Sequence, residues 1–131
     1  MTEHPDCALV RQGYDAFSRG DMETLSQLMT SDVTHHVPGE HPLAGHHKGR
    51  DAVLRLYGRL AEETQGTMRV DLEGTFADGR GHVMSVHRIR ADRGNMGLEE
   101  RGGIFFTVIG GKISDLDECV QDMDETNRFW S

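Results

Sequence analysis

The sequence predicts a single α+β domain in which helices cover one side of a bent, mostly antiparallel sheet. Three observations lead to this fold class. The first half of the chain has helical apolar spacing at three places, the second half alternates like strands, and tight turns divide that half into four segments. Helices segregated to one face of an antiparallel sheet are typical of α+β domains. We expect one domain over residues 1–131, a common length for a single domain.

The helical half begins with a short lead, residues 1–6, that we expect to be frayed. Residues 6–19 form the first predicted helix because their apolar residues recur at helical spacing. Asp21 is placed to cap a second, short helix. Gly49-Arg50-Asp51 opens the third helix, with the negative charge of Asp51 near its positive N-terminal end, and the helix ends before Gly66. The apolar side of this helix consists of Ala52, Val53, Leu56, Tyr57 and Leu60.

One strand is expected between the second and third helices, over residues 32–37. Because side chains alternate between the two faces of a strand, His35 lies on the same face as Val33 and Val37. The next residues, 38–48, include two prolines, two glycines and three histidines, and this composition predicts a loop.

The second half of the chain changes to a period of two residues. Asp78-Gly79 is a strong hairpin signal, and glycines mark the later turns. We therefore expect an antiparallel meander of four strands over residues 68–76, 82–91, 98–109 and 112–122. The last residues, 126–131, do not continue this pattern and are expected to be frayed.

The charge balance limits the kinds of molecule that the protein is expected to bind. The chain has 14 Lys+Arg and 22 Asp+Glu, a net charge of −8, so we expect it to bind neither nucleic acid nor anionic membranes. No apolar run approaches the roughly 18 residues of a membrane span. The first residues lack the features of a secretion signal. We expect a cytoplasmic protein in which Cys7 and Cys119 are reduced thiols.

Three stretches, in the order of these elements, carry a family resemblance. They are the segment Tyr14 to Leu25, the segments 32–39, 43–45 and 49–53, and Gly111-Lys112-Ile113 before the last strand. In these stretches the chain resembles the SnoaL-like branch (polyketide cyclase-like, ketosteroid isomerase-like) of the nuclear transport factor 2-like superfamily. The resemblance implies a cone of three N-terminal helices packed on a strongly bent sheet, with an open end that takes a small apolar organic ligand. It also implies a homodimer that pairs through the sheet, and the expected outward residues Phe105, Thr107 and Ile109 suit such a surface.

The resemblance orients the strands and so selects the residues that should face the cavity. The candidate catalytic residues are His35, His87 and Glu118, one on each of three strands. The candidate substrate-binding residues are Tyr14, Phe17, Val37, Tyr57, Ser85, Ile104, Phe106, Leu116 and Val120. A shift of one residue in register would turn every strand side chain to the other face.

Ketosteroid isomerase, a relative with this fold, uses a carboxylate base with a tyrosine and a protonated aspartic acid as its oxyanion hole. At the matching positions this chain has Val37, Gly13 and Ile104, so that mechanism is not expected. A histidine and a carboxylate in an apolar pocket still suit proton transfer, because burial raises the pKa of a carboxyl group and lowers that of a histidine, so that both can be tuned for work near neutral pH. We hypothesise that His35 or His87 accepts a proton from a carbon acid while Glu118 orients the ring or returns the proton.

The functional hypothesis is a cofactor-independent acid/base enzyme, an isomerase, cyclase or hydrolase, acting on an apolar carbonyl or polyketide-like compound. The alternative is a non-catalytic ligand-binding or assembly module that uses the same cone. An enzyme should hold two convergent titratable groups, whereas a binding module needs only one orienting hydrogen bond. Since this scaffold carries many unrelated functions, the fold alone does not select between them.

Five of the eight histidines lie within thirteen residues: His35, His36, His41, His46 and His47. Imidazole is a common metal ligand, but adjacent histidines on a strand point to opposite faces, and no HExxH motif is present. We expect a solvated loop at the rim of the cavity, with no metal site.

Overall fold

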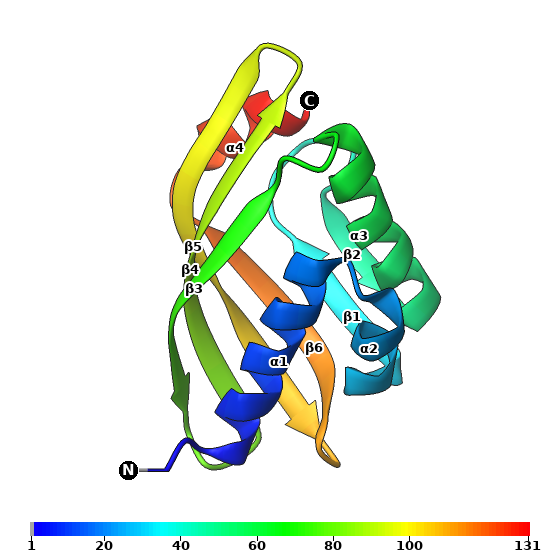
Figure 1. Cartoon of the computed structure of the whole chain (residues 1–131), viewed down its shortest axis with the longest axis vertical. Coiled ribbons are helices and arrows are strands. Elements are labelled where there is room, and N and C mark those ends of the chain that lie inside the picture. The colour runs from blue at the N-terminus through cyan, green and yellow to red at the C-terminus, as the bar shows by residue number, and fades with distance from the viewer. Residues whose placement is uncertain (1) are drawn as a thin grey trace.

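The helices and strands follow the predicted order, with two additions (Figure 1). The computed structural model describes residues 2–131. Its elements are α1 (Pro5–Arg19), α2 (Met22–Leu28), β1 (Met29–Val37), β2 (Gly45–Lys48), α3 (Arg50–Glu63), β3 (Arg69–Ala77), β4 (His82–Arg93), β5 (Met96–Ile109), β6 (Lys112–Val120) and α4 (Met123–Trp130). The strands form one sheet in the order β2-β1-β6-β5-β4-β3. All neighbouring strands are antiparallel except β1 and β6, which are parallel.

The helices α1, α2 and α3 lie together on one side of this sheet, which curves around them (Figure 1). Register shifts interrupt the β3–β4 pair between Leu72 and Gly74, and the β5–β6 pair between Thr107 and Val108. An extra residue on one strand bends it and increases the local twist, so these bulges help the sheet to curve. The predicted α+β cone is confirmed, and its apolar core lies between the concave face and the helices.

Local signals explain the first two helices. His4 caps α1 by accepting a hydrogen bond from the backbone N–H of Asp6, and Pro5 follows at the first helical position. At the other end, Gly20 adopts φ +68°, a left-handed conformation that favours glycine. Asp21 then caps α2 by accepting from the N–H of Thr24, as predicted. The expected frayed lead is therefore wrong for its last residues, and residue 1 lies outside the described residues.

The predicted loop over residues 38–48 is wrong at its end, where it contains β2. This strand pairs with the end of β1, so that His36 lies opposite His46 and His35 opposite His47. β2 has only four residues, and its sequence Gly-His-His-Lys lacks apolar alternation. Such a short, polar edge strand is stabilised by its ladder with β1 and has no periodicity of its own.

The expected frayed end over residues 126–131 is also wrong, because α4 occupies it. Asp122 caps this helix by accepting from the N–H of Glu125. Phe129 is completely buried, and Trp130 is nearly so. Two buried aromatic rings provide enough apolar area to hold so short a helix against the sheet.

The convex face of the sheet carries several large apolar side chains. The most exposed of these are Phe76, Met84, Phe105 and Ile109. Phe105 and Ile109 were predicted to face outward and do so, while Thr107 is half-buried. Among residues 2–131 there is no helix with the length and apolar character needed to span a membrane.

Candidate active site

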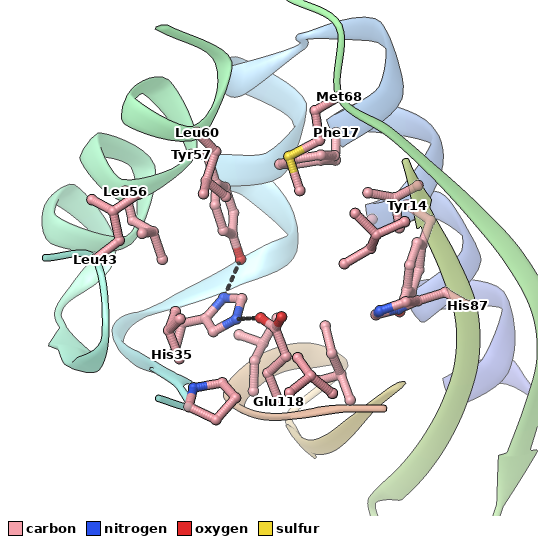
Figure 2. A pocket seen from close by; sticks show the side chains of 18 of the residues that line it. Tyr14, Phe17, His35, Leu43, Leu56, Tyr57, Leu60, Met68, His87 and Glu118 are labelled. Carbon is pink, nitrogen blue, oxygen red and sulfur yellow. Dashed lines mark hydrogen bonds and ion pairs between the residues drawn. The ribbon is translucent and has the colours of Figure 1, made fainter. Parts of the chain in front are cut away.

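A cavity of about 110 Å³ lies between the concave face of the sheet and the helices (Figure 2). This volume is several times the roughly 15 Å³ that one water molecule needs, so a small organic compound fits. Apolar side chains form most of the wall. Eleven of the twelve predicted site residues line it: Tyr14, Phe17, His35, Val37, Tyr57, His87, Ile104, Phe106, Leu116, Glu118 and Val120.

Ser85 is the exception, and its prediction as a cavity residue is corrected. It lies on the inward face of β4 and is buried, but Tyr14 lies between it and the cavity. The Ser85 hydroxyl is 2.8 Å from the Tyr14 hydroxyl and accepts a hydrogen bond from the N–H of Ile104 at 3.0 Å. Ser85 therefore positions Tyr14 and does not reach a ligand directly.

The first polar group in the cavity links Tyr57, His35 and Glu118 (Figure 2). The Nδ1 atom of His35 is 2.9 Å from the Tyr57 hydroxyl, and its Nε2 atom is 2.8 Å from Oε1 of Glu118. Burial raises the pKa of the Tyr57 phenol far above its ordinary value, and the negative charge of Glu118 adds to this shift. A carboxylate oxygen only accepts, so Nε2–H of His35 donates to Glu118, and Nδ1 accepts from the hydroxyl of Tyr57, which keeps its proton.

The second polar group links Ser85, Tyr14 and His87. Tyr14 and His87 lie on the other side of the cavity from His35 (Figure 2). The Tyr14 hydroxyl is 2.6 Å from Nδ1 of His87. Burial raises the pKa of Tyr14 and lowers that of His87, while the Glu118 charge opposes the shift of His87. Near neutral pH, Tyr14 is therefore a protonated phenol and His87 an uncharged imidazole.

Strand pairing explains how residues far apart in the sequence meet here. In the parallel β1–β6 pair, His35 lies opposite Leu116, so Glu118 is two residues farther along the same face of β6. Glu118 in turn lies opposite Ile104 of β5. The inward face predicted for each of these strands is confirmed by the residues that line the cavity.

Sequence reasoning missed several cavity residues at the end nearest α4. Glu100 is buried, and its two carboxylate oxygens accept from the N–H of Asp122 at 3.1 Å and from the Thr126 hydroxyl at 2.6 Å. Trp130 lines the cavity near His41, with 6.4 Å between the ring centroids. Glu100 has the same strand parity as Ile104, so alternation could have identified it.

Three of the other four clustered histidines lie at two places. His41 lines the cavity, and burial lowers its pKa. The rings of His36 and His46 lie against each other on the other face of the sheet, tilted by 30° with 4.5 Å between their centroids, and His36 contacts Asp117. Across residues 2–131, no group of three or more His, Cys, Asp or Glu side chains is arranged to hold a metal ion.

Comparison with known proteins agrees with this fold. A family model for the SnoaL-like domain matches residues 10–116. The chain belongs to the SnoaL-like family. This SnoaL-like protein is also 41% identical to an uncharacterised protein of Mycobacterium tuberculosis over 131 residues, 100% of both chains.

Two solved structures extend the likeness of this SnoaL-like protein. Bal32a, from a soil-derived mobile gene cassette, shares 35% identity at a TM-score of 0.95, with 97% of each chain covered. A nuclear transport factor 2-like protein from Burkholderia xenovorans shares 25% identity at a TM-score of 0.80, with 100% of this chain and 99% of that chain covered. The predicted branch of the nuclear transport factor 2-like superfamily is thereby confirmed.

Proposed function

We propose that this SnoaL-like protein is a cofactor-independent acid/base enzyme, an isomerase, cyclase or hydrolase, acting on a small apolar carbonyl or polyketide-like compound. The observation that carries the proposal is the geometry of Glu118. Oε1 of this carboxylate is held by His35, whereas no group within residues 2–131 donates a hydrogen bond to Oε2. A fixed carboxylate with one free oxygen in an apolar cavity is suited to accepting a proton from carbon.

Each polar residue of the first group has a distinct part in this proposal. Oε2 of Glu118 takes a proton from the carbon next to the substrate carbonyl and returns it to another position. His35 keeps Oε1 in place through its Nε2–H, and Tyr57 fixes the orientation of that ring. Both His35 nitrogens are already bonded, which favours Glu118 as the proton acceptor and His35 as a positioning residue.

A non-catalytic ligand-binding or assembly module remains the second candidate. The observation that favours it is the internal pairing of the polar groups, since Glu100 and His35 have all their hydrogen-bonding atoms bonded within the chain. A binding module would use the apolar wall and a single orienting contact.

Hydrogen–deuterium exchange at carbon separates these two functions. The probe is 2-tetralone in D₂O, with loss of its C1 and C3 proton signals followed by NMR. We expect the protein to accelerate the exchange, and Glu118→Gln to reduce that acceleration at least about 100-fold, since general acid/base groups contribute about that much or more. Asp117→Asn is the matched control, because this exposed neighbour lies on the opposite face of β6.

Equal acceleration by the protein and by Glu118→Gln would exclude Glu118 as the proton acceptor. Binding of 2-tetralone without accelerated exchange would instead favour the ligand-binding module. A saturation-transfer NMR measurement on the same samples reports binding independently of exchange.

We also propose that the protein forms a homodimer through the convex face of the sheet. Phe76 lies opposite Met84, and Met84 opposite Phe105, so three exposed apolar side chains form a row across β3, β4 and β5. A contiguous exposed apolar surface of this kind is typical of an interface. Sedimentation equilibrium should give a dimer that the double variant Met84→Lys, Phe105→Lys converts to monomer. A mass near 14.6 kDa for the unaltered protein at micromolar concentration would contradict the dimer.

The cytoplasm is the proposed location. Cys7 and Cys119 are both free thiols, the first buried and the second exposed. Free thiols are compatible with a reducing compartment.

A further inference from the structure

The imidazole of His87 has one nitrogen in a hydrogen-bond chain and one without a partner. The side chain is only 2% exposed, and its Nδ1 is 2.6 Å from the Tyr14 hydroxyl. Among the described residues, 2–131, no group bonds to the buried Nε2. Since buried polar atoms in proteins are nearly always paired, this atom calls for a partner from outside the chain.

The neighbouring groups decide which nitrogen of His87 carries the proton. The Ser85 hydroxyl lies 3.3 Å from the carbonyl oxygen of Ile104 and can donate to it. Tyr14 then donates to Ser85, and the Tyr14 oxygen accepts from Nδ1–H of His87. Every donor is used in this arrangement, and Nε2 keeps a lone pair. The opposite arrangement would leave Nε2–H as a buried donor without an acceptor, which is rare in proteins.

The residue beside this lone pair on the neighbouring strand is Gly102, which has no side chain to bond to it. It lies opposite His87 in the β4–β5 pair, and a Cβ atom at this position would lie 3.2 Å from Nε2. It would also lie 2.6 Å from the carbonyl oxygen of Cys119, so a side chain here is excluded. Figure 2 shows the His87 ring reaching into the cavity from the side opposite His35.

We propose that Nε2 of His87 accepts a hydrogen bond from a hydroxyl group of the ligand. The compounds for this cavity are then small, neutral and largely apolar, with an alcohol, phenol or enol O–H. This inference rests on the proposed function for the substrate class, since the enol form of a carbonyl compound carries such a hydroxyl. The Glu118 carboxylate on the cavity wall disfavours anionic ligands, and the apolar wall disfavours ligands that need hydration.

Two isosteric probes test the proposal, 2-naphthol and 2-methylnaphthalene, which differ by a hydroxyl in place of a methyl group. The quantity to compare is the ratio of the affinity for 2-naphthol to the affinity for 2-methylnaphthalene. We expect this ratio to be about tenfold larger in the unaltered protein than in His87→Phe, since one buried hydrogen bond accounts for about that factor. Titration calorimetry gives both affinities. The control His82→Gln alters an exposed hairpin histidine bonded to Asp78 and should keep the preference of the unaltered protein.

Nitrogen-15 NMR of the histidine rings gives a second measurement, which does not depend on the folding of any variant. We expect Nε2 of His87 to be unprotonated in the free protein, and its resonance to move on addition of 2-naphthol only. A protonated Nε2, or the same affinity ratio in His87→Phe as in the unaltered protein, would overturn the proposal. Neither measurement needs turnover. A failure of this hydroxyl-binding proposal is therefore distinct from a failure of the proposed function in the exchange experiment with Glu118→Gln.

Discussion

Two of the histidines that line the cavity, His35 and His87, are almost fully buried, yet their surroundings give them different properties. His35 is 5% exposed and His87 is 2% exposed. Both nitrogens of His35 are bonded, to Tyr57 and to Glu118, whereas His87 is bonded only through Nδ1. The two histidines therefore differ in their hydrogen-bond partners far more than in their burial, and this difference underlies the separate roles proposed for them.

The difference in hydrogen-bond partners also explains the separate roles proposed for His35 and His87. His35 acts on the ligand only through Glu118, since no nitrogen is left for a direct contact. His87 has a free lone pair but no carboxylate partner of its own. Substitutions on the two sides should therefore differ in their effect on stability, on pH dependence and on binding.

The largest difference is expected between His35→Phe and His87→Phe. Replacing His35 leaves the Glu118 carboxylate and the Tyr57 hydroxyl unpaired in an apolar cavity, so we expect a loss of about 3 kcal/mol in the free energy of unfolding. Replacing His87 removes a single hydrogen bond and relieves an unpaired atom, so we expect a loss of about 1 kcal/mol or less. Urea unfolding measures both values, and equal losses would show that the two histidines are equivalent.

A smaller effect is expected for Tyr57→Phe. The ring keeps its edge contact with Phe17, and only the hydroxyl that donates to Nδ1 of His35 is lost. We expect a loss of about 1.5 kcal/mol, because a buried ring nitrogen is left without a partner. The proposed proton transfer should also slow, since His35 no longer holds Glu118 in one orientation, while the affinity for 2-tetralone should change little. Unchanged exchange kinetics in Tyr57→Phe would argue that the orientation of His35 does not affect Glu118.

The pH dependence of stability gives the smallest and most selective difference. Burial lowers the pKa of His87 in the folded protein, so the unfolded chain binds the proton first as the pH falls. Stability is therefore complete above the unfolded pKa of about 6.5 and declines as the pH falls from there toward the lower pKa of the folded state. His87→Phe should flatten this decline, whereas the contribution of His41, whose pKa is also lowered by burial, should remain. Unfolding curves at several pH values between 7.5 and 5 would check this; an unchanged slope in His87→Phe would contradict it.

Strand alternation, oriented by the family resemblance, was sufficient to place the central candidate residues on one face of the sheet. His35, His87 and Glu118 lie on three strands, and the parity of each strand placed them on the concave face. Parity gives the face of a residue but not its depth, which is why Ser85 was expected in the cavity and lies behind Tyr14. The pairing of individual ring nitrogens depends on distances between strands and could not be derived from the sequence.

The end of the cavity near α4 was harder to predict because its residues depend on one another. A buried carboxylate such as Glu100 is unfavourable without hydrogen-bond donors, which here are Asp122 and Thr126. These two residues belong to a segment with little periodicity, so the sequence did not indicate them. The eight residues of α4 show their apolar character mainly in the final Phe129 and Trp130. Short elements held by tertiary contacts have weak local signals, as β2 also shows.

The parallel pairing of β1 with β6 has a consequence for the order of folding. His35 and Glu118 are 83 positions apart along the chain, whereas the β3–β4 and β4–β5 hairpins join near neighbours. Closing so long a loop has a large entropic penalty, and contacts of this range form slowly. We expect the hairpins to form first and the group of His35 and Glu118 to assemble in the last steps, so that chains arrested late in folding would have most of the secondary structure but would lack this contact.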